Sequence, residues 1–331
     1  MKPKISVCIT TYNHEKFISQ ALDSVLMQKT DFDFEVLVGE DDSPDNTRDI
    51  VKKYARRYPD KLRLFLNDRK NVIYINGRPT GRWNFINNIR HAKGEYIALL
   101  DGDDCWTDPN KLQVQVDFLE NNPDFSACVH NVNITYMNGN IESHPFYTAY
   151  PNGPNTCKKP ESISTLEDLI VSNFIQTPSV VFRAHLFDRF PEWFCKLDRG
   201  DWPLHVLNAQ HGKIMYLDKI MANYHVHDGG VYSALKLADQ LEGAANVAVI
   251  LDKHLSYKYH NIFFKINTQR FLSMIQLYFS SGNYIQSCKC FFNYIRTYRT
   301  ESLTTLFNYL LDRIKISIKN QKDKAQRFRY K

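Results

Sequence analysis

Three carboxylates follow one buried segment of the sequence, at Asp101, Asp103 and Asp104. Because like charges this close repel one another, a fold that keeps them together needs a compensating charge, and a divalent cation with oxygen ligands is the simplest one. Gly102 lets the backbone turn so that the first two side chains can face one site. The spacing therefore favours a metal–diphosphate site. The alternative is a solvated acidic loop before a helix that Asp108 caps.

Buried strands alternate with helices in the first part of the chain and must position these carboxylates. The strands are predicted from apolar runs, typical of strands covered on both faces, at 5–10, 34–38, 62–66 and 96–100. The alternation indicates a doubly wound, mostly parallel α/β sheet, in which ligands bind beyond the carboxyl ends of the strands. Polar side chains end three of these strands, at 10–13, 40–43 and 101–104. Loops are polar in general, but three such ends together favour one nucleotide-sized site.

The composition is that of a globular protein of one large or two ordinary domains, with 331 residues, 43% hydrophobic and 24% charged. The net charge of +6 comes from residues 311–331, which hold eight Lys or Arg and two Asp. A basic tail of this kind, without a basic aromatic groove, does not indicate a nucleic-acid partner. The seven cysteines form no CxxC pair, which is typical of reduced thiols. With no signal peptide and no apolar run of about 18 residues, we expect a cytoplasmic protein.

The chain changes character after about residue 236, where only helices are predicted. Residues 271–298 are typical of an antiparallel helix hairpin with a turn at 280–283. Apolar residues at helical spacing then run from Leu303 to Ile318 and enter the basic tail. Such a segment suits peripheral binding to an anionic membrane surface, here the inner face of the membrane. The alternative is that the stripe packs on the rest of the chain or on a second subunit of a homodimer.

Four stretches in the first two-thirds of the chain resemble the family 2 glycosyltransferases. They are ISVCITTYNHEKFISQALDSVLMQ, EVLVGEDDSPDNT, KGEYIALLDGDDCWTDPNKL and RGDWPLHVLNAQHGKIMYLDKIMANYHVHDGG. The resemblance implies an α/β GT-A catalytic domain over residues 1–235, with a Rossmann-like, mostly parallel sheet flanked by helices. Residues 236–331 lie outside the resemblance, and we expect them to form a helical C-terminal region with a basic amphipathic tail. The resemblance also implies an inverting, metal-dependent transferase.

The resemblance implies that the ends of the first two strands bind the donor nucleotide. Thr10 and Tyr12 would contact the base and ribose, and Asp41 would hydrogen-bond the base, a uracil in many members. The alternative for Tyr12 is a half-buried aromatic ring that fills the edge of the sheet. Relatives often have Asp-Asp-Gly-Ser where this chain has Glu-Asp-Asp-Ser at 40–43, so Asp42 replaces a glycine and a shifted register is an alternative.

Asp101 and Asp103 match the DxD motif of the family. By that resemblance Asp103 would bind Mg²⁺ or Mn²⁺ on the donor diphosphate, where the metal neutralises charge on the leaving group. Asp101 would contact the ribose or a metal-bound water. His227 matches a histidine near the diphosphate or metal and is expected as a second metal ligand. Relatives often have arginine where this chain has His225, which weakens a phosphate clamp at neutral pH. A structural role is the alternative for each histidine.

Asp201 matches the catalytic acidic residue of the family, at the start of a helix on the acceptor side. An inverting transfer needs a base there to take the proton of the acceptor hydroxyl, and a carboxylate can do so. Without the resemblance, an ordinary helix cap would be the better interpretation of Asp201. Trp202 and Thr177 are expected on the acceptor side. The alternative for Thr177 is the entry of a strand over 178–182.

The implied function is transfer of a sugar from a nucleotide-sugar donor, most often UDP-linked, to a hydroxyl of a glycan or lipid-linked acceptor in surface polysaccharide biosynthesis. The alternative is a catalytically inactive nucleotide-sugar- or glycan-binding module with the same fold. A nucleotidyltransferase is disfavoured because it needs a Gly- and Lys/Arg-rich loop after the first strand, and residues 10–14 (TTYNH) have neither.

Overall fold

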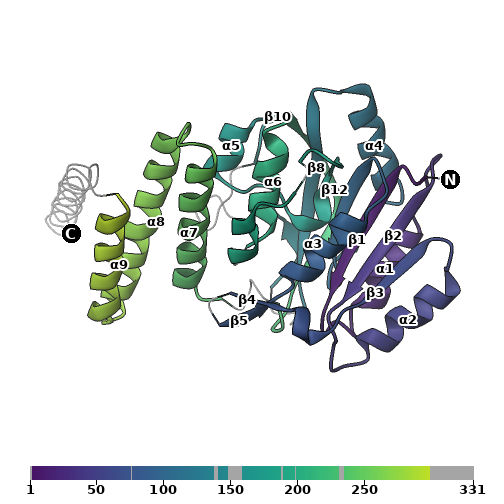
Figure 1. Cartoon of the computed structure of the whole chain (residues 1–331), viewed down its shortest axis with the longest axis horizontal. Coiled ribbons are helices and arrows are strands. Elements are labelled where there is room, and N and C mark those ends of the chain that lie inside the picture. Colours follow the sequence, from purple (N-terminus) through teal and green to yellow (C-terminus); the bar gives the residue numbers. More distant parts are fainter. Residues whose placement is uncertain are drawn as a thin grey trace, which may run out of the picture. The chain divides into compact units, whose positions relative to one another are not determined.

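The structure is a computed structural model that describes residues 2–75, 77–137, 141–147, 159–187, 189–197, 199–230 and 235–298. Figure 1 labels its elements along the chain. The strands are β1 (Ile5–Thr11), β2 (Phe34–Glu40), β3 (Leu62–Leu66), β4 (Ile73–Ile75), β5 (Arg78–Thr80), β6 (Tyr96–Asp101), β7 (Cys105–Trp106), β8 (Phe125–Tyr136), β9 (His144–Pro145), β10 (Ile163–Ser164), β11 (Val181–Arg183) and β12 (Lys213–Val226). The helices are α1 (Ile18–Leu26), α2 (Thr47–Arg57), α3 (Arg82–His91), α4 (Lys111–Asn121), α5 (Leu166–Val171), α6 (Asp201–Ala209), α7 (Leu237–His254), α8 (His260–Ser280) and α9 (Tyr284–Thr297). Short 3₁₀ turns span Arg69–Asn71, Thr177–Ser179 and Glu192–Lys196.

Most of the strands form one mixed sheet in the order β10-β12-β8-β11-β6-β1-β2-β3. The half from β6 to β3 is parallel, as the alternation of strands and helices predicts. Strand β11 is antiparallel to both β6 and β8, whereas β8 and β12 pair in parallel. The predicted mostly parallel α/β sheet flanked by helices is therefore confirmed, with an inserted antiparallel strand that breaks the simple doubly wound pattern.

The two faces of the parallel half are covered by different helices. Ile5, Val7 and Ile9 alternate along β1 and share one apolar core with α1, α2 and α4. On β2, Val36 and Val38 belong to the same core, so Gly39 faces the opposite side. There it meets side chains of α3, which packs on β1 and β2. The sheet is thus buried on both faces, which explains its continuous apolar strands.

The strand register brings three polar strand ends to one edge of the sheet. Thr10 pairs with Gly39 on one side and with Asp101 on the other, and Thr11 pairs with Glu40. The ends of β1, β2 and β6 therefore lie level with one another. This is the arrangement predicted for a ligand site at the carboxyl edge.

The strand expected at 178–182 begins later than predicted. Thr177 to Ser179 form a 3₁₀ turn in which Pro178 is the second residue, and the strand starts only at Val181. Proline has no N–H for a strand ladder and its fixed φ suits a helical turn. The Ser179 hydroxyl closes the turn by donating to the Gln176 carbonyl at 2.7 Å.

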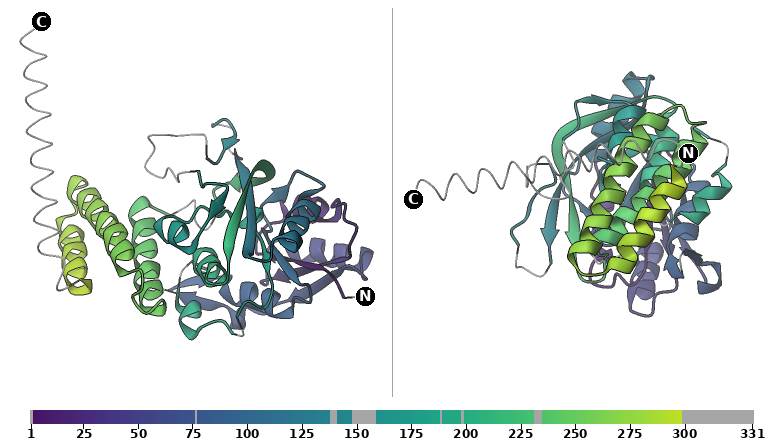
Figure 2. Two further views of the ribbon diagram at one scale, coloured as in Figure 1. Left: turned by 90° about the horizontal axis from the view of Figure 1, so that it is seen from above. Right: turned by 90° about the vertical axis from the view of Figure 1, so that its left-hand side faces the viewer.

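The chain divides into two compact units, Met1–Lys236 with Asn246–Tyr259 and Leu237–Ala245 with His260–Lys331. The chain first changes unit after Lys236, and the second half of α7 belongs with the first unit. The predicted domains 1–235 and 236–331 stay a prediction. In the second unit α8 and α9 run side by side (Figures 1 and 2) and confirm the predicted hairpin. No helix of the described residues is long and apolar enough to cross a membrane. The stripe predicted over 303–318 and the basic tail lie outside the described residues, and membrane binding stays a prediction.

Candidate active site

The carboxylate cluster sits where β6 leaves the sheet. Asp101 accepts a 2.8 Å hydrogen bond from the Thr10 hydroxyl, so the ends of β1 and β6 are joined by side chains as well as by backbone. Asp104 is buried and accepts from the backbone N–H of His225 at 2.9 Å through Oδ1. Its Oδ2 has no hydrogen-bond partner among the described residues. A buried carboxylate oxygen without a partner is costly in an apolar setting, so the cluster is suited to a cation.

The pKa values within the cluster are pushed apart by burial and mutual repulsion. Burial, followed by the charge of Asp103, raises the pKa of Asp101 to about 7. Burial and the same neighbour raise the pKa of Asp104 well above its usual range. Burial also opposes ionisation of Asp103, but hydrogen bonding from His227 and the charge of His14 outweigh it and lower the pKa of that carboxyl. Asp103 is thus the member of the cluster that most readily carries a negative charge.

Two histidines from β12 and its end converge on Asp103. The His227 Nε2 atom lies 3.0 Å from Asp103 Oδ2, and His225 Nδ1 lies 2.6 Å from the Asp103 backbone carbonyl oxygen. Their shared direction agrees with the alternation of side chains along a strand. The Asp103 hydrogen bond raises the pKa of His227 above its usual value. Phe17 packs beside both imidazoles, with ring centroids 6.0 Å from His225 and 4.6 Å from His227.

His14 approaches the same carboxylate oxygen, with Nε2 at 3.6 Å from Asp103 Oδ2. Gly102 makes this approach possible, because a Cβ there would lie 2.6 Å from Thr11 Oγ1 and 2.8 Å from His14 Nδ1. The sequence suggested that the glycine served a turn. The structure shows that it leaves room for two side chains of the β1 end.

The fit of a divalent metal to this cluster depends on Asp103 and His227. Among the described residues no group of three or more His, Cys, Asp or Glu side chains is arranged to hold a metal alone. Asp103 Oδ2 and His227 Nε2 lie 3.0 Å apart and hydrogen-bond to each other, so both would be metal ligands only if the ion took the place of this bond. A site with only two or so protein ligands suits a magnesium-like ion that takes its remaining ligands from substrate phosphates and water.

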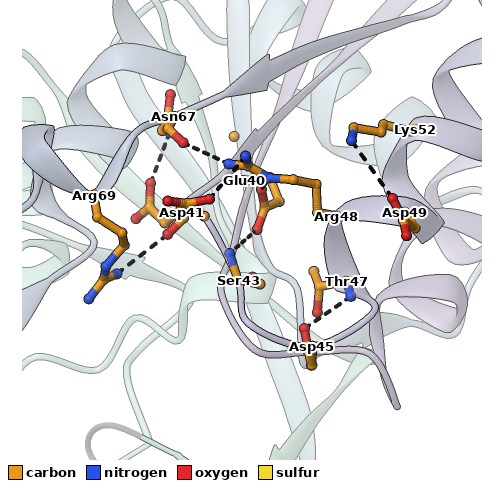
Figure 3. A network of polar contacts seen from close by, with 12 residues as sticks. Glu40, Asp41, Ser43, Asp45, Thr47, Arg48, Asp49, Lys52, Asn67 and Arg69 are labelled. Carbon is orange, nitrogen blue, oxygen red and sulfur yellow. Dashed lines mark hydrogen bonds and ion pairs between the residues drawn. The ribbon is translucent and has the colours of Figure 1, made fainter.

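Asp41 is buried just beyond the end of β2. Asn67 donates to Asp41 Oδ1 at 2.9 Å, and burial raises the pKa of this carboxyl despite that bond. Arg69 reaches the Asp41 backbone oxygen at 3.4 Å and covers the ring of Tyr12 at 4.5 Å from its centroid. Figure 3 shows Asp41 between Asn67 and Arg69. Tyr12 is 39% exposed, so a flat ring is available for stacking next to a carboxylate that can accept a hydrogen bond.

The turn after β2 is held by Glu40. Glu40 is fully buried, pairs with Arg48 and accepts from the backbone N–H of Ser43 at 2.7 Å (Figure 3). Asp42 has a left-handed backbone with φ of 58°, the conformation that a glycine adopts at no steric cost. The departure from the family pattern therefore keeps the turn, with Asp42 in a position that favours glycine. Glu40 is a structural residue of this loop.

Asp201 begins α6, and its carboxylate enters the same site. Asn173 donates to Asp201 Oδ2 at 3.0 Å. The charge of Asp201 also contributes to the raised pKa of Asp101, so the two carboxylates share one electrostatic environment. One turn later His205 is buried, and burial lowers its pKa to about 4, so a neutral imidazole lies behind the Asp201 carboxylate at neutral pH.

The two residues expected on the acceptor side lie in different surroundings. Trp202 is buried and donates from Nε1 to the Leu169 carbonyl at 3.0 Å, which packs α6 against α5. Acceptor contact by Trp202 stays a prediction that this burial does not favour. The Thr177 side chain hydrogen-bonds the Asp101 carboxyl group, so it lies next to the carboxylate cluster, and acceptor contact by Thr177 stays a prediction.

Sequence reasoning missed His14, Arg69 and Asn173 as members of the site. His14 lies in the segment TTYNH at the end of the first strand, and this position was the one feature of the sequence that could have indicated it as a site residue. Arg69 and Asn173 come from connections that had no motif. Their roles depend on which segments the fold brings together.

A sequence model of the family described as "Glycosyl transferase family 2" matches residues 6–190. The chain belongs to glycosyl transferase family 2. Its site residues from Thr10 to Asp104 fall inside this match, whereas Asp201 and His227 lie beyond it. The family prediction is thereby confirmed.

Proteins of similar sequence agree with this assignment. An uncharacterized protein of Mycobacterium tuberculosis is 35% identical over 229 residues, which are 69% of this chain and 60% of that protein. This chain therefore spans about 60% of the length of that relative. An Escherichia coli protein named UDP-Glc:alpha-D-GlcNAc-diphosphoundecaprenol beta-1,3-glucosyltransferase WfgD is 34% identical over 138 residues, 42% of this chain and 46% of that protein.

Solved structures show the same fold at low sequence identity. Staphylococcus aureus TarS (residues 1–349) is similar with a TM-score of 0.51 and 21% identity, covering 86% of this chain and 80% of that one. The mannosyltransferase PcManGT of Pyrobaculum calidifontis, solved with GDP-Man and Mn²⁺, has a TM-score of 0.52 and 16% identity over 98% of this chain and 88% of that one. The predicted GT-A fold is confirmed by these likenesses.

Proposed function

We propose that this family 2 chain is an inverting glycosyltransferase that moves a sugar from a UDP-linked donor to a hydroxyl of a glycan or lipid-linked acceptor, with Mg²⁺ or Mn²⁺. One observation carries the proposal: the Asp101 carboxyl, hydrogen-bonded by Thr10, lies within the electrostatic influence of both Asp103 and Asp201. Acidic groups for a donor diphosphate and an acidic group for an acceptor thus occur together. A module that only binds its ligand does not need an acidic group for an acceptor.

On the donor side, each residue has a separate task. Tyr12 stacks on the base, and the Asp41 carboxylate accepts the N3–H of uracil. Asp101 and Thr10 hold the ribose. Asp103 and His227 would hold the metal, which would supply positive charge to neutralise the departing nucleoside diphosphate. Asp41 is suited to its task because Asn67 donates to its Oδ1 at 2.9 Å and the Asn84 side chain also hydrogen-bonds this carboxyl, so the carboxylate is held in place.

On the acceptor side, Asp201 takes the proton of the attacking hydroxyl. The acceptor oxygen forms a bond to the anomeric carbon as the bond from that carbon to the diphosphate oxygen breaks. The proton ends on the Asp201 carboxylate, and the electron pair leaves with UDP. Attack on the face opposite the leaving group inverts the anomeric centre. Asn173 orients the carboxylate by its 3.0 Å hydrogen bond, which favours one oxygen for the proton.

The choice of UDP rests on a relative and on the chemistry of Asp41. The E. coli relative carries UDP-Glc and a diphosphoundecaprenol acceptor in its name. The same two substrate classes, a UDP-sugar and a lipid-linked glycan, are proposed for this chain. A role in surface polysaccharide biosynthesis follows from that acceptor class, and peripheral contact with the membrane would serve it.

The first test is calorimetric binding of UDP, GDP and dTDP to the full chain, each with and without Mn²⁺. We expect UDP to bind best and to lose affinity without Mn²⁺ or in Asp103→Ala. Asp117→Asn, an exposed carboxylate on α4, is the matched control and should bind as wild type does. A preference for GDP or dTDP would refute the uracil assignment. A folded protein that binds no nucleotide would refute the proposal.

The second test separates an enzyme from a binding module. Wild-type protein should slowly hydrolyse UDP-glucose or UDP-GlcNAc, with water in place of the acceptor. Asp201→Asn should abolish this hydrolysis while UDP affinity stays the same. Hydrolysis that survives in Asp201→Asn would exclude Asp201 as the base. UDP binding without turnover in wild type, even with a panel of acceptor glycans, would favour the inactive module.

A further inference from the structure

Two buried side chains from the first turn of helix α3 contact two different glycines. On the donor side, Asn84 donates to the Gly39 carbonyl at 2.7 Å. A Cβ on Gly39 would lie 1.6 Å from Asn84 Oδ1, so Asn84 fills the space that this glycine leaves. Gly39 is two residues before Asp41, and the Asn84 side chain hydrogen-bonds the Asp41 carboxyl as well. Asn84 therefore fixes the end of β2 where Asp41 leaves it.

On the acceptor side, the Arg82 side chain fills the space that Gly200 leaves. A Cβ on Gly200 would lie 1.4 Å from Arg82 Nη1, so the buried guanidinium rests directly on the backbone next to Asp201. Arg82 Nη2 donates to the Leu197 carbonyl at 3.0 Å. The guanidinium also covers the ring of Phe194, 4.9 Å from its centroid. Arg82 thus contacts the segment before α6 at three points.

Helix α3 is itself held firmly on the sheet. Asn88, one turn along the helix, is fully buried and donates to the Ile9 carbonyl of β1 at 2.8 Å. Because β1 and β2 form the centre of the parallel half, α3 cannot shift without disturbing the core. Side chains on a fixed helix turn can hold two loops at a constant separation, which is how rigid elements preorganise reacting groups.

We propose that the first turn of α3 fixes Asp41 and Asp201 relative to each other, with Arg82 as the positioning residue for Asp201 and Asn84 as the positioning residue for Asp41. Gly39 and Gly200 are required because only a residue without Cβ lets these side chains reach the backbone. The inference rests on the proposed function for the roles of Asp41 and Asp201. The contacts themselves do not depend on it.

The first experiment tests the Arg82–Gly200 contact without any need for activity. Thermal unfolding is measured for Gly200→Ala, Arg82→Ala and the double variant of the full chain. Gly200 has φ of −115°, which alanine adopts freely, so its only conflict is with Arg82. We expect Gly200→Ala to lower the melting temperature in wild type and to have little effect in Arg82→Ala. Gly81→Ala, whose new Cβ meets nothing nearer than 3.9 Å, is the control.

Amide hydrogen exchange of residues 199–204 gives a second readout that is independent of substrate. Exchange there should be faster in Arg82→Ala than in wild type or Gly81→Ala. Equal exchange, or additive effects on melting temperature, would overturn the proposal whether or not the chain is an enzyme. If both readouts hold but wild type binds no nucleotide, the proposed function fails and the positioning of this segment by Arg82 stands.

The catalytic consequence is read from UDP-glucose hydrolysis. Gly200→Ala and Arg82→Ala should lower kcat by about 10- to 100-fold, the size expected for a misplaced catalytic group, while the Kd for UDP stays within about twofold. Gly39→Ala should instead weaken UDP binding. A kcat near wild type in a folded Gly200→Ala variant that shows the stability coupling would refute the positioning role. Equal loss of UDP affinity in all three variants would indicate general damage to the fold and would refute it too.

Discussion

The Nε2 atom of His227 lies 3.0 Å from Oδ2 of Asp103, although 124 residues separate them in the chain. The contact joins the end of β12 to the end of β6, which are not neighbours in the sheet. It keeps Asp103 ionised next to two carboxyls whose pKa values are raised. The pair therefore sets where negative charge resides in the cluster, which is the first requirement for binding a cation.

Replacement of His227 by alanine should weaken metal-dependent nucleotide binding. We expect the affinity for UDP with Mn²⁺ to fall about 10- to 100-fold, the range found when a ligand or its partner is lost from a metal site. Binding without Mn²⁺ should change little. Calorimetry of both conditions measures the effect, and His211→Ala, an exposed histidine after α6, is the control. Equal losses with and without Mn²⁺ would rule out a role at the metal.

Lys111 should make stability depend on pH. It is fully buried on α4, donates to Gln115 at 2.8 Å, and burial lowers its pKa to about 7 from an ordinary 10.5. Between these values the unfolded chain holds the proton and the folded chain does not, so a rise in pH favours folding. From pH 7 to 9, wild type should gain up to about 1.4 kcal/mol per pH unit relative to Lys111→Met.

Urea unfolding at pH 6, 7, 8 and 9 measures this difference. Below pH 7 both states hold the proton, so the difference between wild type and Lys111→Met should become constant there. Lys53→Met, an exposed lysine on α2, should show the same pH profile as wild type. Parallel profiles for wild type and Lys111→Met would show that the buried amine keeps its proton.

Asp42 offers a test of backbone strain in the donor loop. Its φ of 58° costs an L-residue roughly 1–2 kcal/mol that glycine does not incur. Asp42→Gly should therefore be more stable than Asp42→Ala by about 1 kcal/mol. Both variants lose the ion pair between Asp42 and Arg48, at 3.0 Å, so its contribution to stability cancels in the comparison. Thermal unfolding decides, and an alanine variant as stable as the glycine variant would show that the loop has relaxed.

Asn267 should stabilise the second compact unit of the chain. It is fully buried on α8 and donates to the Ala245 carbonyl at 3.1 Å and the Tyr298 hydroxyl at 2.9 Å. Asn267→Ala leaves the Ala245 carbonyl without this donor and should destabilise the unit by about 1–3 kcal/mol. Thermal unfolding with amide exchange of α8 and α9 measures it. Asn261→Ala, exposed on the same helix, should have little effect, and equal effects of the two would contradict the prediction.

Much of the fold was predictable because each element of the first unit has a local signature. The apolar runs of β1, β2 and β6 and the amphipathic helices between them determine a parallel α/β half. The strand predicted over 178–182 is present as β11, but it starts only at Val181, and its antiparallel direction was not predictable because three residues after a proline turn have no periodicity to detect. The site residues at strand ends were found because parallel strands bring their ends to one edge.

What the sequence by itself determined is the set of groups that we propose to carry the chemistry: the carboxylates after β6, the acidic turn after β2 and the aspartate that begins α6. Their spacing within each segment is short, so local rules apply to it. Only the tertiary structure decided their partners. The contacts of His14 and His227 with Asp103, and of Arg82 with Gly200, join segments far apart in the chain, and the packing of helices on the sheet brings them together. That packing depends on the whole core, and no local pattern of residues encodes it.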